Sequence, residues 1–540
     1  MLDTFGPVSA AGGPVTYGVA MGGQTYDIVV VGGGHNGLVA AAYLARAGLS
    51  VLLLERLEQF GGAAVSVEPF AGSPARLSRY SYLVSLMPEQ LMADLDLDVR
   101  LASRSTASFT PYVRGGRPGG LLVERPEGPA TRESFRHLTG GEDEYAAWQA
   151  FYDEVGALAR TVAPTLMRPL PRRRELADAV SGTVWRDVVE RPLGEAIERR
   201  FTDDTVRGVV ATDALIGTFA SLHDASLVQN RCFLYHLIGN GTGEWRVPVG
   251  GVGAVTRGLA RAASNAGAEL RSGAEVVAVR PGAGSVEVEW RDASGTHAVV
   301  ASQVLSNVAP WVLDGLLGRS RSPLEKPQGA QLKINFLLDR LPRLRSGVDP
   351  EVAFAGTLHL SEDYSQLEVA YASAAEGRVP EALPGEVYCH SLSDDSILGP
   401  LAGAAHTLTY FGLHTPAALF DRDPSAKEVA VSRALASLNT HLAEPIEDCL
   451  ARDASGQPCI EAKIPQDIEQ DLAMPGGHIF HGDLSWPWLS DSAPADSPAQ
   501  AWGVDTGVEG VLVCGSGAAR GGAVSGLGGH NAAQAALASL

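Results

Sequence analysis

The sequence predicts an α/β protein that combines a Rossmann-like nucleotide-binding domain with an inserted mixed α+β domain. Three observations lead to this prediction. An apolar run at Tyr26–Val31 enters a cluster of glycines, an Ala-rich segment with helical spacing follows, and a second apolar run at 50–54 stops at an acid. Helical and Pro-rich segments later interrupt the chain, and a Gly-rich loop with an Ala-rich helix closes it. Strands that alternate with helices indicate a parallel sheet.

Length, charge and cysteine content limit the classes of protein and partner. A chain of 540 residues is too long for one compact core, and 45% hydrophobic with 19% charged residues is typical of a soluble globular protein. The formal charge of −20 disfavours nucleic acid and permits only peripheral contact with anionic membranes. The 5 cysteines are scattered without Cys-x-x-Cys spacing. A cytoplasmic protein without a disulfide framework, a zinc site or any other metal is therefore expected.

The first 24 residues contain neither lysine nor arginine and have no long apolar core. This composition argues against a signal peptide and predicts a disordered N-terminal tail over residues 1–24. Met21 is an alternative to Met1 as the start of the protein. No run reaches the roughly 18 apolar residues of a membrane span.

The glycine cluster has the spacing Gly32-x-Gly34-x-x-Gly37 between the first β-run and a predicted helix over 36–47. Gly32 permits the tight turn, Gly34 lets the backbone approach a pyrophosphate, and Gly37 allows close packing of helix on strand. The helix N-terminus offers free N–H groups to phosphates. Glu55 ends the second β-run, where a carboxylate accepts hydrogen bonds from ribose hydroxyls. The alternative is a Gly-rich turn in another kind of α/β unit, and His35 is interpreted as a loop residue.

The residues after Glu55 favour FAD over NAD. Arg56 and the stretch Gly61–Ala64 extend the motif to "ERLEQFGGAA". An acid, a basic residue and a downstream glycine pair resemble the fingerprint of the glutathione-reductase-like and amine-oxidase-like FAD-binding superfamily. Here the glycine pair would run close beneath the pyrophosphate and ribityl chain; the alternative is an ordinary loop. The sequence has no second complete nucleotide motif, so we expect one tightly held cofactor and no separate NAD(P) domain.

The rest of the chain divides into segments that differ in the spacing of their apolar residues. Residues 131–235 have helical spacing, 275–308 alternate as an antiparallel meander, and 320–470 mix strands with a helix near 425–443. The predicted organisation is therefore a tail (1–24), three FAD-binding parts (25–110, 236–319 and 471–540) and two substrate-domain parts (111–235 and 320–470).

Several blocks in order resemble the phytoene desaturase-like FAD-dependent oxidoreductases, within them the branch named after pyridine nucleotide-disulfide oxidoreductase domain-containing protein 2. The blocks include "GGGHNGLVAAAYLARAGLSVLLLER", "GAQLKINFLLDRLP", "GGHIFHGDLS" and "VLVCGSGAARGGAVSGLGGHNAAQAA". Where many relatives have His-Pro in the last block, this chain has Ala519 and Arg520. The "disulfide" in the name has no support, because the chain lacks a redox cysteine pair.

The resemblance implies a set of FAD contacts. It places Val276 or Val277 against the adenine through the backbone, Gly515 and Ser516 near the ribityl phosphate, and Gly526 and Leu527 near the isoalloxazine. A helix that starts near Gly526 would stabilise negative charge on the reduced ring. The full set of expected FAD contacts is Gly32, Gly34, Gly37, Glu55, Arg56, Gly62, Ala63, Val276, Val277, Gly515, Ser516, Gly526 and Leu527.

The implied reaction is desaturation of an apolar small molecule. A substrate hydride would pass to flavin N5, a proton would leave the neighbouring carbon, and O2 or a quinone-like acceptor would reoxidise the cofactor. A flavin amine oxidase is an alternative that predicts an aromatic pair over the flavin, for which Trp486, Trp488 and Trp502 are candidates. A non-catalytic scaffold of the Rab-escort type is another.

Two residues are candidates for catalysis. His481 lies in "HIFHGDLS" and either faces the flavin cavity or is a structural histidine. Lys333 lies in the middle of the β-run "QLKINF", where it either touches flavin or substrate or snorkels to the surface.

Overall fold

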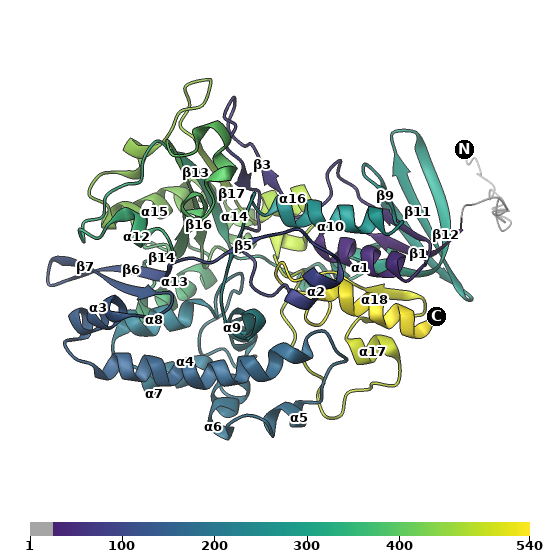
Figure 1. Ribbon diagram of the computed structural model, residues 1–540, viewed down its shortest axis with the longest axis horizontal. Helices are drawn as coiled ribbons and strands as arrows, with labels where there is room; N and C mark the ends of the chain where they lie inside the picture. Colours follow the sequence, from purple (N-terminus) through teal and green to yellow (C-terminus); the bar gives the residue numbers. More distant parts are fainter. Residues whose placement is uncertain (1–24) are drawn as a thin grey trace, which may run out of the picture.

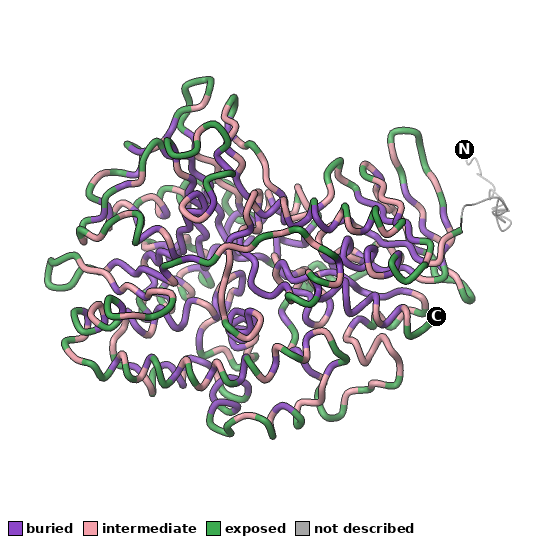
Figure 2. The backbone as a smooth tube through the Cα atoms, viewed as in Figure 1, coloured by how far each residue is buried: buried purple, intermediate pink, exposed green. Residues whose placement is uncertain are grey.

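The computed structural model describes residues 25–540, which form two large β-sheets, two short β-ribbons and a layer of helices (Figure 1). The predicted tail over residues 1–24, with its two candidate start residues, lies outside the described residues. Buried segments run through both sheets and the helices between them, whereas exposed segments follow the periphery (Figure 2).

The first sheet is the nucleotide-binding type that the sequence predicts. Its central strands β12, β1 and β2 pair in parallel, and β9 continues the sheet in parallel beyond β2. The meander is also confirmed, because β10, β11 and β12 pair in antiparallel order. The strands are β1 (Thr25–Val31), β2 (Val51–Leu54), β9 (Glu269–Arg271), β10 (Glu275–Gly282), β11 (Ser285–Asp292), β12 (Gly295–Ser306), β18 (Asp505–Val508) and β19 (Val511–Val513).

Helices from both ends of the chain cover this sheet. Helix α1 (His35–Arg46) packs against α18 (Leu527–Ser539) and α10 (Gly253–Asn265). An alanine at Gly529 of α18 would place its Cβ 1.9 Å from Asn36 O, so the two helices meet backbone to backbone. This contact brings the N-terminal glycine motif and the C-terminal block together, although almost 500 residues separate them in sequence.

The second sheet has the order β17-β13-β16-β15-β14-β6-β7. Strand β6 spans residue 110, where the sequence places a domain boundary, and it pairs only within this second sheet. That boundary stays a prediction. The strands are β6 (Thr106–Arg114), β7 (Arg117–Glu124), β13 (Leu332–Leu338), β14 (Thr357–Leu360), β15 (Gly385–Tyr388), β16 (His406–Gly412) and β17 (Ile460–Lys463), and two short ribbons pair β3 (Ser66–Val67) with β4 (Leu77–Ser78) and β5 (Leu101–Ala102) with β8 (Val247–Pro248).

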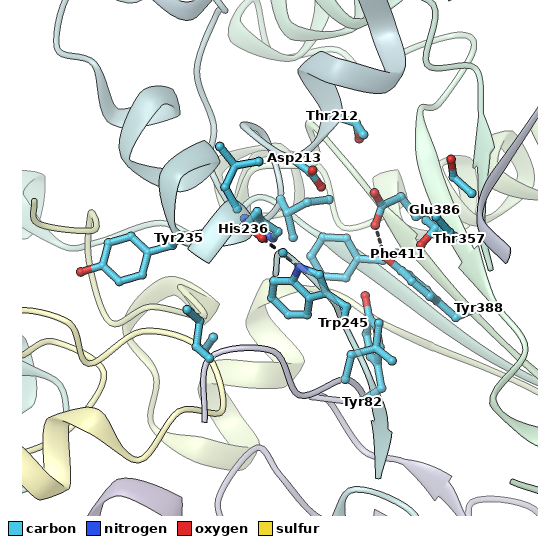
Figure 3. Close-up of a pocket in the computed structure, with 18 of the residues that line it drawn as sticks. Tyr82, Thr212, Asp213, Tyr235, His236, Trp245, Thr357, Glu386, Tyr388 and Phe411 are labelled. Carbon is cyan, nitrogen blue, oxygen red and sulfur yellow. Dashed lines mark hydrogen bonds between the residues drawn. The ribbon is translucent and has the colours of Figure 1, made fainter. Parts of the chain in front are cut away.

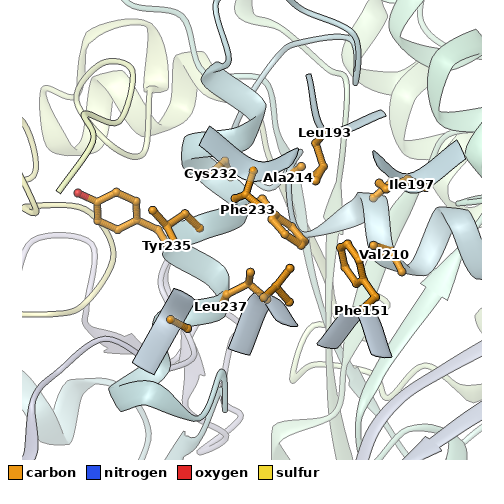
Figure 4. Packing of buried hydrophobic residues seen from close by; sticks show 14 of the residues in the cluster. Phe151, Leu193, Ile197, Val210, Ala214, Cys232, Phe233, Tyr235 and Leu237 are labelled. Carbon is orange, nitrogen blue, oxygen red and sulfur yellow. The ribbon is translucent and has the colours of Figure 1, made fainter. Parts of the chain in front are cut away.

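A helical layer packs beneath the second sheet. Its core gathers Phe151, Val210 and Phe233 from α4, α8 and α9, as Figure 4 shows. Burial of these apolar faces accounts for the three-to-four spacing seen in the sequence. The layer contains α3 (Pro129–Thr139), α4 (Asp143–Val162), α5 (Arg173–Ala177), α6 (Gly182–Trp185), α7 (Leu193–Arg200), α8 (Asp204–Thr212) and α9 (Val228–Ile238).

The remaining helices flank the two sheets. They are α2 (Glu89–Asp94), α11 (Pro310–Leu316), α12 (Pro350–Ala353), α13 (Tyr364–Ala375), α14 (Ala417–Arg422), α15 (Ala426–His441), α16 (Pro465–Leu472) and α17 (Pro498–Trp502). Among residues 25–540, none of the helices has both the length and the apolar character needed to cross a lipid bilayer.

Candidate functional site

Three parallel strands end at one edge of the first sheet, and the glycine motif begins there. Val31, Ser306 and Val513 close β1, β12 and β19. Asn307 follows β12 and donates its Nδ2 to Gly32 O at 3.0 Å. Ligands of open α/β sheets bind beyond the carboxyl ends of the strands, so this edge is the candidate nucleotide site.

The spacing of the glycines is set by sterics. A Cβ on Gly37 would lie 2.2 Å from Gly32 O, and one on Gly34 would lie 2.9 Å from Asn307 Nδ2. Glycine at these positions therefore lets α1 start directly against the end of β1. As a result, the first N–H groups of α1 point over the sheet edge, where they are free to bind an anion.

The second glycine pair lies against the first. The Gly61 N–H donates to Gly33 O at 2.8 Å, and a Cβ on Gly62 would lie 3.3 Å from Gly34 Cα. Two glycine segments thus form one shallow backbone surface. Arg56 is exposed and donates to Asp471 O at 2.9 Å, so it borders this surface instead of lying within it.

Glu55 is 8% exposed and accepts hydrogen bonds from Gly33 N at 2.6 Å and Leu57 N at 2.8 Å. Burial raises its pKa, and the two backbone donors oppose that shift. Strand β10 enters beside it, because Ala274 N donates to Glu55 O at 2.8 Å. Val277 falls in a bulge between Val276 and Ala278 and has no partner in β11. Pairing of Val276 or Val277 with adenine stays a prediction.

The C-terminal block closes the site. A Cβ on Gly515 would lie 2.5 Å from Asn307 O, which keeps this loop against the strand ends. His35 Nε2 lies 3.0 Å from Ala523 O, and Asn36 Nδ2 donates to Gly521 O at 3.2 Å. Gly526 adopts φ 73°, a left-handed conformation that favours glycine, and it is the N-cap of α18. We call the surface formed by Gly32–Gly37, Gly61–Ala63 and Gly515–Leu527 the cradle.

The cradle fits a dinucleotide with two phosphates. Two helix N-termini, a backbone surface without side chains and a buried carboxylate at the second strand end supply the groups that a pyrophosphate and a ribose need. Cβ atoms at Gly34, Gly37 and Gly515 would clash with Asn307 or Gly32, so these segments pack closely only as glycine. The cradle and its edge contain Gly32, Gly34, Gly37, Glu55, Gly62, Ala63, Gly515, Ser516, Gly526 and Leu527, with Arg56 at the rim. Contact of these residues, and of Val276 and Val277, with FAD stays a prediction.

A cavity of about 650 Å³ adjoins the cradle. Ala63 and the segment Gly522–Val524 form its wall on the cradle side, and strands of the second sheet and helices α4, α8 and α9 form the rest. Aromatic side chains dominate one part, where Tyr82 and Tyr388 have ring centroids 4.9 Å apart. Figure 3 shows Asp213 and Glu386 in the same cavity wall. The cavity is mainly apolar with a small polar region, as is typical of small-molecule sites.

Lys333 lines this cavity and is 3% exposed, so the surface interpretation of this lysine is wrong. Its Nζ donates to Asn335 Oδ1 at 2.9 Å and to backbone carbonyls of Ser78 and Arg79. Burial lowers the pKa of Lys333 to about 7. A mid-strand lysine among apolar residues was a usable signal for this position, but the pattern did not show which face of the strand is buried.

His481 lies beside the C-terminal loop, where a Cβ on Gly517 would be 3.7 Å from His481 Cβ. Its Nδ1 makes no hydrogen bond within the described residues, and burial lowers its pKa to about 3. A neutral imidazole next to the cradle is compatible with a histidine that faces the flavin and with a structural histidine. Its role stays a prediction.

The aromatic pair expected of an amine oxidase is found elsewhere. Trp486 and Trp488 stack with centroids 4.9 Å apart, and Trp488 also packs on Trp185. Trp502 packs against His530 of α18. These tryptophans belong to the helical and nucleotide cores and do not line the cavity.

Two arrangements of side chains are not evident from the sequence. One is a buried cluster of His359, Glu362 and Glu386 beside the cavity, whose members lie in strands or loops without any motif spacing. The other is Arg520, which is 1% exposed and donates to the carbonyls of Leu166, Arg168 and Pro487. An arginine in a Gly-rich loop gave no sign that its side chain is buried.

We predict that Arg520→Met destabilises the protein by about 3–5 kcal/mol, because three buried carbonyl groups lose their donors at about 1–3 kcal/mol each. The free energy of unfolding in urea measures this loss. Arg378→Met is the control, since Arg378 is exposed and pairs only with the neighbouring Glu376. An equal, small effect of both substitutions would contradict a clamping role for Arg520.

Comparison with known proteins agrees with this geometry. A family model described as an NAD(P)-binding Rossmann-like domain matches residues 30–89. Among solved structures, a putrescine oxidase bound to putrescine aligns with TM-score 0.55 and 16% identity, covering 95% of this chain and 98% of that one. Cyclohexylamine oxidase from Brevibacterium oxydans IH-35A aligns with TM-score 0.54 and 15% identity, over 95% and 98%. At this identity the likeness concerns the fold.

The fold and the cradle define the class: this is a flavin-type oxidoreductase fold with a Rossmann-like dinucleotide-binding domain. An uncharacterized protein of Mycobacterium tuberculosis is 50% identical over 96% of this chain and 98% of its own length. Pyridine nucleotide-disulfide oxidoreductase domain-containing protein 2 of Mus musculus is 29% identical over 95% of this chain and 94% of its own. The chain belongs to the same protein family as the mycobacterial protein and is homologous to the mouse protein over nearly its whole length.

Proposed function

We propose that the protein is an FAD-dependent oxidoreductase that dehydrogenates a small molecule with a largely apolar body. The observation that carries this proposal is the junction of cradle and cavity at Ala63 and Gly522–Val524. A flavin in the cradle would lie against a substrate in the cavity. The homologous mouse protein, named as an oxidoreductase, and two structural neighbours, both amine oxidases, support the same reaction type.

When bound, FAD supplies an acceptor for a hydride at its N5. The chain holds and orients the substrate and excludes water through apolar walls such as Leu86, Val209 and Ile216. The substrate loses a hydride from one carbon and a proton from its neighbour, so a double bond forms. Lys333 lines the cavity, and its Nζ, with a pKa of about 7, is the proposed acceptor of that proton if it gives up one of its three hydrogen bonds to Ser78, Arg79 and Asn335. O2 or a quinone-like molecule is the proposed final acceptor.

Amine oxidation is the second candidate, and one observation favours it. Asp213 and Glu386 line the cavity; burial raises the pKa of both carboxyls, and a cationic amine beside them would favour their charged forms and pair with them. The stacked tryptophans do not support it, because they are not on the cavity wall.

Anaerobic mixing of FAD-loaded protein with two substrate panels tests the proposal. Apolar alkenes and carotenoid-type hydrocarbons form one panel, and primary amines and diamines form the other. Loss of flavin absorbance near about 450 nm, where the oxidised flavin absorbs, with hydrocarbons is the expected result. Bleaching by amines alone would favour the second candidate. A pure protein that cannot be loaded with FAD would overturn both and favour a binding scaffold.

A further inference from the structure

Three ionisable side chains meet behind the polar part of the cavity. His359 of β14 and Glu386 of β15 are direct partners across two antiparallel strands, so both side chains point to the same face of the sheet. Glu362 follows the end of β14 by two residues. One ligand atom from each of the three side chains lies within 4.8 Å of the other two. We call His359, Glu362 and Glu386 the buried triad.

The triad is removed from solvent. His359 is 4% exposed, and Glu362 and Glu386 are each 2% exposed. His359 and Glu386 nevertheless form part of the cavity wall, whereas Glu362 lies behind them. The triad is therefore reached from the cavity, and its third member is accessible only to a small ion.

The surroundings orient the donors toward one another. His359 Nδ1 is hydrogen-bonded to Thr110 Oγ1 at 2.8 Å, which leaves Nε2 facing Glu386 Oε1 at 3.9 Å. The Tyr388 hydroxyl donates to the other carboxylate oxygen of Glu386. A hydrogen bond that fixes the far nitrogen of an imidazole is the usual second shell of a metal-binding histidine.

Glu362 is the unexplained member. Neither of its carboxylate oxygens meets hydrogen-bond geometry with a donor among the described residues, although the Thr212 hydroxyl lies near enough to favour the charged carboxylate. Neither glutamate forms an ion pair with a lysine or arginine of residues 25–540. Arg104 interacts with Glu386 only at longer range. Its guanidinium donates hydrogen bonds to Trp245 O and Thr357 Oγ1 instead. A buried carboxylate without a partner is strongly unfavourable, so either a proton or a bound cation must compensate its charge.

We propose that the buried triad binds one divalent transition-metal ion of the zinc or manganese type. One imidazole nitrogen with carboxylate oxygens suits these ions better than calcium, which takes oxygen ligands, or copper(I), which prefers sulfur. Donors bound at about 2.1 Å lie at most about 4.2 Å apart, so the triad closes on an ion by small side-chain rotations. The sequence analysis predicts no metal site, and this proposal differs from that prediction.

A substrate ammonium group fits the triad less well. It would reach His359 and Glu386 from the cavity but would leave Glu362 without a partner. A metal ion binds all three and leaves coordination positions open toward the cavity, where they can accept an oxygen atom of a bound molecule. Metal binding at the triad does not require a flavin in the cradle.

Calorimetric titration of the chelator-treated full-length protein with Zn²⁺ and with Mn²⁺ tests the site. We expect one ion per chain, and Co²⁺ should give a visible absorption band that Zn²⁺ removes. Glu362→Gln should weaken binding at least 100-fold. Thr110→Val, which frees His359 Nδ1 without altering a ligand, should weaken it about 10–100-fold.

Glu127→Gln is the matched control, because Glu127 lines the same cavity outside the triad. It should leave the affinity within about twofold of wild type, a change of only about 0.4 kcal/mol. If Glu362→Gln does not fold, Thr110→Val and the wild-type stoichiometry decide. Absence of 1:1 binding, or binding that neither Glu362→Gln nor Thr110→Val weakens, overturns the proposal and indicates a carboxyl pair that shares a proton.

Discussion

Gly37→Ala should yield a folded protein that purifies without flavin. The new Cβ would lie 2.2 Å from Gly32 O and 3.3 Å from Asn307 Cβ, and a backbone oxygen cannot rotate away. Helix α1 must therefore shift away from the end of β1, so that its first N–H groups no longer point toward the pyrophosphate site. Loss of one or two charge-assisted hydrogen bonds amounts to about 3 kcal/mol, or about 100-fold in FAD affinity.

Flavin content after purification and FAD titration of the apoprotein measure this change, while circular dichroism reports whether the fold persists. Gly315→Ala is the control, since its Cβ would meet no atom within 4 Å. A yellow Gly37→Ala protein with one FAD per chain would show that the cradle is not the cofactor site.

Wild-type protein should become more stable between pH 7 and pH 10, and Lys333→Met should remove that gain. Burial lowers the pKa of Lys333 to about 7 from 10.5, so the unfolded chain binds more protons than the folded chain within this window. The free energy of unfolding then rises with pH by up to about 1.4 kcal/mol per unit. Below pH 7 the folded protein bears the full cost of the buried charge.

Urea unfolding at several pH values measures the slope. Other groups titrate in the same range in both proteins, so the difference between wild type and variant isolates Lys333. Lys326→Met is the control, because Lys326 is part-exposed and pairs with Glu469. Equal slopes for wild type and Lys333→Met would mean that Lys333 has an ordinary pKa in the folded state.

The nucleotide-binding unit was predictable because its signals are local. Gly32, Gly34 and Gly37 lie between a strand and a helix that are adjacent in sequence, and Glu55 ends the next strand. Observed boundaries differ from the predicted ones by about one residue, with α1 at His35–Arg46 against a predicted 36–47. The start of α18 directly after Gly526 also agrees with the prediction. Period and turn chemistry decide such elements over short stretches.

The cavity wall was not predictable in the same way. The sequence marks Lys333 as a lysine in the middle of an apolar β-run. Only the position of β13 between β16 and β17 shows that its side chain is buried. Arg520 was noted as a departure from its relatives, yet its acceptors at Leu166, Arg168 and Pro487 lie in distant segments. Period-two alternation tells which residues share a face but not which face meets another domain.

The sequence alone determined the Rossmann-like unit, the use of both chain ends at one site and the family, since each depends on residues read in order. Only the tertiary structure decided the shape of the cavity and its polar end. Thr110, Thr212, His359 and Glu386 come together there because β6, β14 and β15 are neighbours in the second sheet and α8 ends beside them. Strand order is fixed by packing over the whole chain, and no local pattern encodes it.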